Sequence, residues 1–560
     1  MSTPRSRRST GLIAAACALL IVATGCTAPP IVEEQTPPPV VDASELPLTA
    51  WERAQPGDVA EGGEVGIGVD ALPSNFNPAR ICPCDAAGLR VLDPTAGGPF
   101  VLDEQGEAVL DEDYALSAEV TGADPLVVEL HLNPDAVWED GTPLTAGDYV
   151  ATWSALNGSD AAYRPASSAG YDAVRQMTVG DDAHHLIATF ARPFTDWPLL
   201  FRFVLPERVA QDPAAFNAGF ASTPLPSNGP FVVTEIEDGE GVVLDRNPLW
   251  WGDVPVLERI RFQVVRDDER AAWYASGELD VMDVASDEAV AASAMADDDV
   301  RVQRSRGDDV VLLTIRAGDG PLAEPGVRRA LALMLDRQAL AEIGLAEGVA
   351  VSAVGDHLLV PGEAGYTDRA PATDPEAAEA ALEVAGFSAE GGEWARDGEV
   401  LRLTLGVRSG AASDRARAEG VRDQLAAEGI AVDIVELSRL VPFDEDDDIA
   451  GVDMLLSTWH RPPFPLASLR SLYAPLYSGS NLTQMSAPEL GSLWDALDAE
   501  ADPETRARDA EAVDEILWQE LPAVPMVAPP RVEAVSAGLR NLGAAAYESV
   551  DWTSVGWAEQ

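Results

Sequence analysis

Hydrophobic and polar residues recur with regular periods along most of the chain, and these periods predict its secondary structure. The alternation over Glu64–Val69 and over Val127–Leu132 is typical of strands. After Thr145, apolar residues recur at helical spacing, and Asp148 stands three residues further on, which predicts a capping box at the start of a helix. Strands and helices therefore interleave, and the pattern indicates a mixed α/β chain.

Four further helices are predicted in the second half of the chain. They are expected over Val327–Leu340, from Pro375 to just before Gly386, over Arg415–Glu428 and over Asp509–Leu521. Asp374 is the expected N-cap of the second helix, with proline at its first position and glycine after its end. Gly429 ends the third helix before a strand predicted over Ile430–Val435.

The first residues lack these periods and predict a targeting segment. Three arginines precede the apolar run Leu12–Ala23. This run is shorter than the roughly 20 residues that span a bilayer, and it fits the central part of a signal peptide. It ends in Ala23-Thr24-Gly25-Cys26, which is similar to a bacterial lipobox, so residues 1–25 are predicted to be removed and Cys26 to be lipidated. The alternative is ordinary secretory cleavage nearby.

Residues 26–60 are rich in proline and predict an extended tether between the anchor and a folded body. The remaining part of the chain, about 500 residues, is too long for one ordinary domain and suggests two to four. Its sequence contains no second apolar run of membrane-spanning length.

The charge of the chain excludes several classes of function. There are 94 acidic and 37 basic residues, for a net charge of −57. Such a balance argues against nucleic acid as a partner and against a polybasic contact with a membrane. All basic residues are arginine. The sequence therefore has no P-loop lysine, no Schiff-base lysine and no Ser-x-x-Lys nucleophile.

Cysteine and histidine residues offer little support for a metal site. Cys82 and Cys84 are predicted to form a small-loop disulfide outside the cytoplasm, with a metal site as the alternative. Of the five histidines, the neighbours His184 and His185 are interpreted as surface residues. Without a spacing of carboxylates and histidines typical of a preformed site, no metal ligand and no cofactor are predicted.

Six segments of the chain resemble, in order, those of a known family. They are Gly62-Gly63-Glu64 with Asn77-Pro78, Trp138–Asp148, Ser227–Phe231, Arg246–Gly252, Ser276–Asp280 and Val327–Arg337. Together they resemble family 5 of the bacterial extracellular solute-binding proteins, the dipeptide-, oligopeptide- and nickel-binding components of ABC importers. The resemblance runs from about Gly62 to the C-terminal region. Nickel is the poorer choice of ligand because of the histidine pattern.

The resemblance implies an α/β, bilobed periplasmic-binding-protein-like fold with an extra domain and a ligand cleft between hinged lobes. The expected parts are a discontinuous first lobe, an extra domain inserted into it and a second lobe. Their bounds are expected at 61–100, 222–320 and 525–560 for the first lobe, 101–221 for the extra domain and 321–524 for the second lobe.

The candidate ligand-binding residues follow from the same resemblance. Peptide-binding relatives carry an aspartate three residues after a tryptophan, which pairs with the ammonium group of the peptide. Here Pro462 stands at that position, after Trp459, His460 and Arg461. The other expected ligand-binding residues follow the first strand or lie near the C-terminal third. They are Ser74, Asn75, Phe76 and Asn481.

The expected function is that of a lipid-anchored binding protein without enzymatic activity. It would capture peptides or peptide-like small molecules as a monomer, deliver them to ABC permease subunits, and touch the membrane through its lipid anchor alone. One alternative is a ligand-sensing lipoprotein that acts through a partner. Another is an extracellular hydrolase, although the sequence lacks Gly-x-Ser-x-Gly and His-Glu-x-x-His motifs. No catalytic residue is assigned.

Overall fold

The computed structural model describes most of the folded body. The described residues are 40–559, except for 74, 81–85, 238, 267, 286–287, 346–347, 438–448, 450, 462–464, 474–480 and 486. The predicted signal peptide, the lipidated Cys26, and Ser74, Cys82 and Cys84 lie outside these residues, so the predictions made for them remain predictions.

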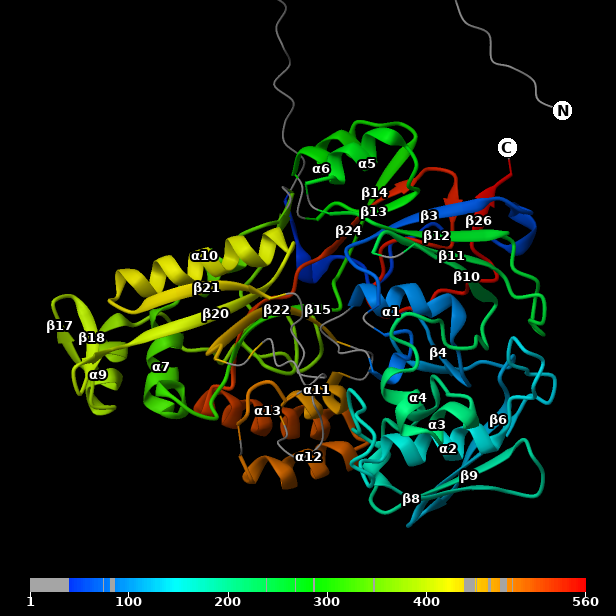
Figure 1. The fold of residues 1–560 in the computed structure, drawn as a ribbon, viewed down its shortest axis with the longest axis horizontal. Helices are drawn as coiled ribbons and strands as arrows, with labels where there is room; N and C mark the ends of the chain where they lie inside the picture. The colour runs from blue at the N-terminus through cyan, green and yellow to red at the C-terminus, as the bar shows by residue number, and fades with distance from the viewer. Residues whose placement is uncertain are drawn as a thin grey trace, which may run out of the picture. The chain divides into compact units, whose positions relative to one another are not determined.

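The first large sheet combines strands from the beginning, the middle and the end of the chain (Figure 1). Within the described residues its order is β10 (Phe231–Glu237), β11 (Gly241–Arg246), β12 (Arg259–Val264), β3 (Glu64–Val69), β13 (Val281–Asp283), β24 (Arg531–Ser536) and β14 (Val300–Ser305). β3 pairs in parallel with β12 and β13, whereas β24 pairs antiparallel with β13 and β14. Residues more than 450 positions apart in the sequence therefore share one sheet.

Helices pack on this sheet through apolar side chains. α5 (Arg270–Ser276) and α6 (Glu288–Met295) lie beside β13 and β14, where Val290 and Ala294 of α6 join a small buried cluster (Figure 1). α1 (Ala86–Leu92) contributes Val91 and Leu92 to the larger core of the sheet. Val69, the last residue of β3, belongs to the same core, so the end of that strand and α1 lie near one another.

The second large sheet is formed by later parts of the chain. Its strands, in the part of the chain that the structure describes, are β21 (Ala431–Leu437), β20 (Arg402–Arg408), β22 (Met454–His460), β15 (Asp309–Ile315) and β23 (Ala523–Val527). β15 falls within the range 222–320 expected for the first lobe, yet it pairs with β22 and β23 of this sheet. The chain therefore passes from one sheet to the other between β14 and β15, at residues 306–308.

Both faces of the second sheet are covered by helices. The alternation along β15 places Val311, Leu313 and Ile315 in one core and Val310 and Leu312 in another, because successive side chains of a strand point to opposite faces. One face packs against α7 (Pro325–Met334), α9 (Pro375–Val384) and α10 (Ala412–Ala427), and the other against α11 (Pro465–Tyr473), α12 (Glu489–Ala499) and α13 (Pro503–Glu520).

A third, antiparallel sheet forms within the residues expected for the extra domain. Its described strands have the order β6 (Ala115–Ala123), β7 (Leu126–Leu132), β9 (His185–Phe190) and β8 (Val174–Val179). α2 (Ala146–Leu156), α3 (Glu207–Ala210) and α4 (Pro213–Ala218) accompany it, and its core contains Trp138, Phe190 and Phe201.

Short strands complete the fold. The described pairs and triples are β1 (Val41–Asp42) with β16 (Val349–Ala350); β2 (Val59–Ala60), β26 (Gly556–Ala558) and β25 (Leu539–Arg540); β4 (Phe100–Leu102) with β5 (Ala108–Leu110); and β17 (Ser388–Glu390), β18 (Glu393–Arg396) and β19 (Glu399–Val400). α8 (Arg337–Ala341) is a further short helix. In the described part of the chain, the helices all lack the length and apolar character needed to cross a membrane.

Most of the predicted elements are confirmed. β3 has the predicted bounds, and β7 begins one residue earlier than predicted. Thr145 and Asp148 form the predicted capping box of α2, and Asp374 caps α9 through a hydrogen bond from Ala377 N. The strand predicted after Gly429 is β21. α10 and α13 both begin a few residues earlier than predicted, at Ala412 and Pro503.

The single helix predicted over Val327–Leu340 is wrong. The structure has two helices, α7 and α8, because Leu335 is extended between them, with φ −90° and ψ 124°. The side chain of Asp336 accepts a hydrogen bond from Ala339 N and caps α8, and Asp336 N donates to the side chain of Gln424 at 2.7 Å. Capping by the aspartate thus competes successfully with continuation of the helix.

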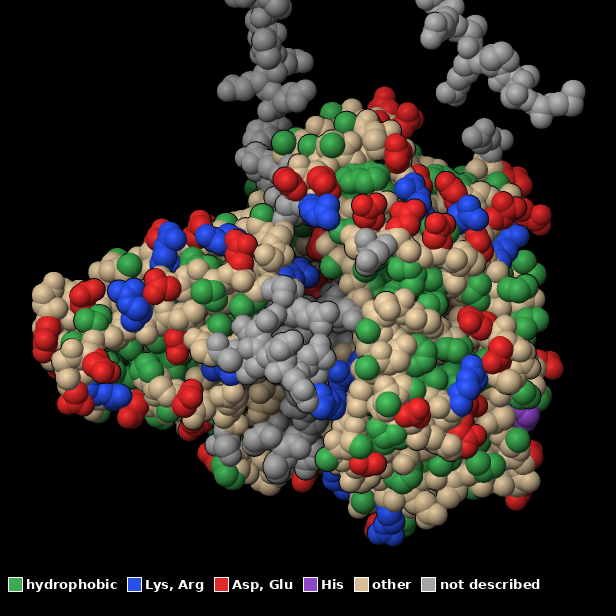
Figure 2. Space-filling model, in the orientation of Figure 1, with side chains coloured by type: hydrophobic (Ala, Val, Ile, Leu, Met, Phe, Trp, Pro, Cys, Tyr) green, Lys and Arg blue, Asp and Glu red, His purple; other side chains and the backbone are tan. Residues whose placement is uncertain are grey.

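Charged side chains are dispersed over the visible face of the protein. Figure 2 shows acidic and arginine side chains interspersed there, with apolar atoms between them. The net negative charge of the chain is therefore not gathered into one pole on this face, which is typical of a solvated acidic surface.

Candidate ligand-binding site

A cavity of about 540 Å³ lies where the first sheet, α1, the extra-domain segment and the C-terminal segment meet. This volume is within the range of small-molecule sites, which is about 300–1,000 Å³. The end of β3 contributes Gly68, Val69 and Asp70, and the C-terminal segment contributes residues 542–543, 545–550 and 552. Parts of the chain that are distant in the sequence thus form one wall.

The cavity has an apolar side. Its side chains come from α1, from the end of α2 and from the segment before α3, and the set includes Leu89, Leu92, Leu156, Leu199, Leu200 and Phe203. The apolar side belongs partly to the core of the third sheet, where Leu156 and Leu200 are buried. Burial of a ligand's apolar groups against this side would stabilise the complex by about 25 cal/mol per Å² removed from water.

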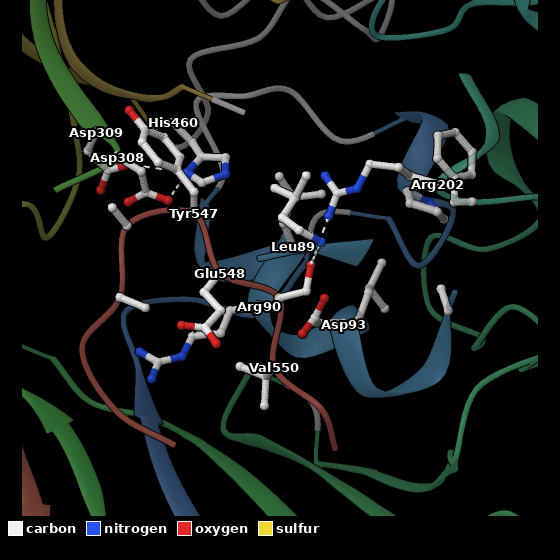
Figure 3. Close-up of a pocket in the computed structure, with 18 of the residues that line it drawn as sticks. Leu89, Arg90, Asp93, Arg202, Asp308, Asp309, His460, Tyr547, Glu548 and Val550 are labelled. Atoms are coloured by element: carbon white, nitrogen blue, oxygen red, sulfur yellow. Dashed lines mark hydrogen bonds and ion pairs between the residues drawn. The ribbon is translucent and has the colours of Figure 1, made fainter. Parts of the chain in front are cut away.

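A cluster of four charged residues forms another part of the wall, and three of them, Asp308, Asp309 and His460, are labelled in Figure 3. His460, the last residue of β22, is paired with Asp309, the first residue of β15, in the antiparallel register. His460 Nδ1 lies 3.1 Å from Asp308 Oδ2 and 3.3 Å from Asp309 Oδ1. Arg531, at the start of β24, contacts the other oxygen of Asp308, Oδ1, at 2.6 Å. We call Asp308, Asp309, His460 and Arg531 the cavity cluster.

The charges of the cavity cluster stabilise one another. Burial alone would raise the pKa of Asp308, but Arg531 and His460 outweigh it and lower that pKa well below its usual range. Burial alone would lower the pKa of His460, but Asp308 and Asp309 outweigh it and raise that pKa to about 10. At neutral pH, His460 is therefore a cation and Asp308 an anion.

The same cluster is the candidate for a metal site. One ligand atom each from Asp308, Asp309 and His460 lie within 4.8 Å of one another. A metal-bound imidazole must be deprotonated, however, and the pKa of His460 opposes this. Arg531 also occupies one oxygen of Asp308. The donors are thus arranged as an ion-pair network, and their chemistry does not fit a cation.

Two further carboxylates lie on the cavity wall near Arg270. Burial first, and then the charge of Asp70, raises the pKa of Asp283 to about 6. Arg270 contacts Asp70 at 3.7 Å and donates a hydrogen bond to the backbone oxygen of Asp283. Asp70 remains largely exposed, with 53% of its side chain accessible. These carboxylates are acceptors that a cationic group in the cavity can reach.

The wall opposite the cavity cluster carries Asp93 with two arginines near it (Figure 3). Burial raises the pKa of Asp93, although the indole of Trp552 donates to its Oδ2 at 2.7 Å. Arg90 is paired with the buried Glu533 at 2.8 Å. The second of the two arginines, Arg202, follows the short 3-10 helix Trp197–Phe201.

Of the candidates on β22, the structure places His460 on the cavity wall and Trp459 in a core. Neighbouring residues of a strand point to opposite faces, so Trp459 packs into the core beside α11–α13. Arg461 is also buried, paired with Glu363 at 2.9 Å and donating to Leu358 O at 2.9 Å. Glu363 accepts a hydrogen bond at 2.5 Å from the hydroxyl of Tyr547, which lines the cavity. Arg461 therefore acts on the cavity wall through this chain of contacts.

The other described candidates are not among the residues that line the cavity. Asn75 accepts a hydrogen bond from Asn77 N at 2.9 Å, and Phe76 packs into the core of the first sheet. Asn481 accepts a hydrogen bond from the Thr483 hydroxyl at 2.5 Å. Pro78 and Ala79, which follow Asn77 in the sequence, do line the cavity.

His185, interpreted from the sequence as a surface residue, is buried. It begins β9, lies 2.9 Å from Glu129 on the neighbouring strand, and stacks on His131 with a centroid distance of 4.4 Å. The interpretation as surface was wrong because pairing of β9 with β7 places His185 between two other side chains.

Sequence reasoning missed most of the charged wall. Asp308, Asp309, Arg531, Tyr547 and Glu548 belong to no motif that the sequence analysis singled out. A partial signal exists for Asp308 and Asp309, an acidic pair placed at the start of an apolar strand. No signal of this kind marks the C-terminal segment, whose residues form a wall through tertiary contacts.

The chain matches known proteins over most of its length. Residues 110–480 match the model of the bacterial extracellular solute-binding proteins, family 5, middle part. The chain is 30% identical over 511 residues to the oligopeptide-binding protein OppA of Mycobacterium tuberculosis, covering 90% of this chain and 86% of the relative. It is 27% identical over 497 residues to LpqW of the same organism, a probable monoacyl phosphatidylinositol tetramannoside-binding protein, covering 82% and 75%.

Solved structures are similar in fold. The oligopeptide-binding protein AppA of Bacillus subtilis, solved with a nonapeptide, superposes with a TM-score of 0.79 at 16% identity, covering 90% of this chain and all of AppA. The periplasmic EDTA-binding protein EppA superposes with a TM-score of 0.77 at 23% identity, covering 92% and 99%. These likenesses confirm the predicted bilobed α/β fold.

Proposed function

The chain belongs to family 5 of the bacterial extracellular solute-binding proteins, as its motifs indicated, and we propose that it is the lipid-anchored binding component of an ABC importer for peptides or peptide-like small molecules. In this function the protein binds its solute outside the cytoplasm and passes it to permease subunits. Binding requires no chemical step, since the ligand is released unchanged.

The cavity of about 540 Å³ is the observation that carries this proposal. Its wall combines an apolar side with the charged groups of the cavity cluster, Asp70 and Asp283. Peptides present the same mixture of apolar side chains and terminal charges. The relatives named as oligopeptide-binding proteins favour this ligand class over the many others that the fold accommodates.

Pro462, at the position of the expected ammonium-binding aspartate, lies outside the described residues. We propose that the cavity carboxylates replace it. Asp283 and the exposed Asp70 face the cavity from the first sheet, and the guanidinium of Arg270 neutralises only part of their charge. An ammonium group placed between them would lower the pKa of Asp283 and regain the energy lost by its burial.

Anchoring through Cys26 serves this function because a receptor must remain near its permease. Bilayer attachment by one acyl chain is weak, so stable anchoring needs more than one chain. Replacement Cys26→Ser should abolish incorporation of labelled palmitate and release the protein into the medium. Persistent label on the variant would contradict the assignment of the anchor, with Cys17→Ser, in the predicted signal peptide, as the control.

The binding proposal is tested by thermal denaturation and native mass spectrometry with a library of peptides of two to five residues. Ligand at 100 times its Kd should stabilise the native state by about 2.7 kcal/mol. The variant Ala169→Phe, which fills the cavity, should lose this shift, whereas Ala161→Phe on the exposed surface should keep it. Absence of binding across the library, or equal binding by both variants, would contradict peptide capture in this cavity.

A further inference from the structure

Arg202 differs from the other cations of the cavity wall in lacking a carboxylate partner. Arg531 is paired with Asp308, Arg90 with Glu533, and His460 with two aspartates. Within the described residues, no carboxylate oxygen lies within 4.0 Å of Arg202. Its guanidinium donates a long hydrogen bond of 3.4 Å to the hydroxyl of Ser549.

The surroundings of Arg202 make this absence costly. Its Nε atom is buried and has no hydrogen-bond partner among the described residues. Burial lowers the pKa of Arg202, and the distant charge of Asp93 offsets this only in part. A partly buried guanidinium without a close anion has lost part of its hydration and gained no ion pair in return, so an anion supplied from the cavity would stabilise it.

The position of Arg202 gives a ligand access to it. Arg202 lines the cavity beside Leu199, Leu200 and Phe203. In Figure 3 it lies across the cavity from Asp308, Asp309 and His460, with Leu89 between them. A ligand that reaches Arg202 therefore extends along the apolar side of the cavity, and its other end approaches the acidic wall.

We propose that Arg202 binds a carboxylate group of the ligand, and that the cavity selects ligands that carry such a group. This inference rests on the proposed function of the cavity as the ligand site. A carboxylate matches the fork of guanidinium donors and carries a single charge. A doubly charged phosphate is disfavoured because Asp93 lies close enough to Arg202 to interact with its charge, and its carboxylate would repel a second negative charge on the ligand. For a peptide, the group would be the C-terminal carboxylate.

The test compares the wild type with Arg202→Gln and with Arg208→Gln. Arg208 is a matched control because it lies on α3, six residues further along, and forms an exposed pair with Asp140 at 3.0 Å. The first probes are sodium propionate and sodium glutarate, against tetramethylammonium chloride at equal ionic strength. Both carboxylates should raise the melting temperature of the wild type and of Arg208→Gln in a saturable way, and Arg202→Gln should require at least about tenfold more of either.

The second probes are the peptides of the binding test, each with a free or an amidated C-terminus. The wild type should prefer the free acids by about tenfold or more, and this ratio should fall to about one in Arg202→Gln. If Arg202→Gln does not fold, Arg202→Lys is measured in its place. The inference is then decided by whether the wild type prefers the free acids to the amidated peptides.

The outcomes separate this inference from the proposed function. Equal affinity for free and amidated peptides, with no effect of carboxylates, would overturn the role of Arg202 while peptide capture stands. Carboxylate binding that depends on Arg202, without binding of any peptide, would support the inference and overturn peptide capture. Failure of both probe sets would overturn both.

Discussion

Two clusters of charges, each built around a buried aspartate, join distant parts of this chain, and they balance charge against burial in different ways. The first is the cavity cluster. The second, which we call the helix cluster, consists of Arg192, Arg470, Asp495 and Asp498. Arg192 follows β9, and the other three residues lie on α11 and α12, so this cluster joins the extra-domain segment to the helices of the second sheet.

The geometry of the central aspartate differs between the clusters. In the cavity cluster, Arg531 contacts one oxygen of Asp308 and His460 the other. In the helix cluster, Arg192 and Arg470 both contact Oδ2 of Asp498, at 2.9 and 2.5 Å. Two cations on separate oxygens avoid mutual crowding, whereas two cations on one oxygen repel each other more strongly.

The pKa values of the two aspartates reflect this difference. Burial opposes ionisation in both, but the cations prevail at Asp308 and burial prevails at Asp498, whose pKa is raised. The cavity cluster is therefore a polar wall whose charges are fixed before a ligand arrives. The helix cluster acts as a cross-link within the protein, and Arg202, with neither kind of partner, is left for a ligand.

The largest expected effect is that of Asp308→Asn, which leaves Arg531 and His460 without their shared anion. Breaking a buried ion pair on one side typically costs about 3–5 kcal/mol. The free energy of unfolding, measured by urea denaturation at pH 7, should fall by this amount, and the pKa of His460 should fall with it. Asp309→Asn is the control and should cost less, because the carboxylate of Asp309 is partly exposed and, among the described residues, forms an ion pair with His460 alone. Equal losses would contradict the central role of Asp308.

The pH dependence of the cavity cluster follows from His460. Its pKa in the folded protein, about 10, is above the unfolded value of 6.5, so its stabilising effect is full below about pH 6.5 and is lost as the pH rises through 10. The difference in unfolding free energy between the wild type and His460→Gln should therefore shrink steadily from pH 6 to pH 10.5. A difference that stays constant over this range would show that His460 is not held as a cation.

A smaller loss is expected for Asp498→Asn in the helix cluster. Because burial already disfavours the ionised form of Asp498, replacement should cost about 1–2 kcal/mol at pH 7, less than replacement of Asp308. On acidification this loss should not shrink, because the raised pKa of Asp498 means that protonation of its carboxyl stabilises the folded wild type relative to the unfolded chain. Urea denaturation of both variants at pH 7 and pH 4 measures the size of each loss and its pH dependence. A larger loss for Asp498→Asn than for Asp308→Asn at pH 7 would refute the comparison.

The smallest effect is expected at the rim of the cavity. Arg53 lies 2.7 Å from Glu548, a residue of the cavity wall, but 52% of the arginine side chain is exposed. Pairs of this kind contribute about 0–1 kcal/mol, and less at high salt. Arg53→Gln should therefore change the melting temperature very little, and a loss comparable to that of Asp498→Asn would show that the rim pair is shielded from solvent.

The sequence by itself determined the local elements and the family. The capping box at Thr145 and the cap at Asp374 are interactions between residues three positions apart, so the sequence displays them directly. The alternation in β3 is likewise local, and the six motifs indicated the family to which the chain belongs. At Asp336 two local signals competed, the helical periodicity of the apolar residues and the capping tendency of the aspartate. The prediction followed the periodicity and gave one helix instead of two.

The tertiary structure alone decided the composition of the cavity wall. Trp552 and Asp93 are 459 positions apart and Arg531 and Asp308 are 223 positions apart, yet each pair is in direct contact. Pairing of β22 with β15 decided that His460, and not its neighbour Trp459, faces the cavity. The reason is physical: the charge and protonation of a buried group depend on what lies within a few ångströms of it, and only the folded chain brings those neighbours together.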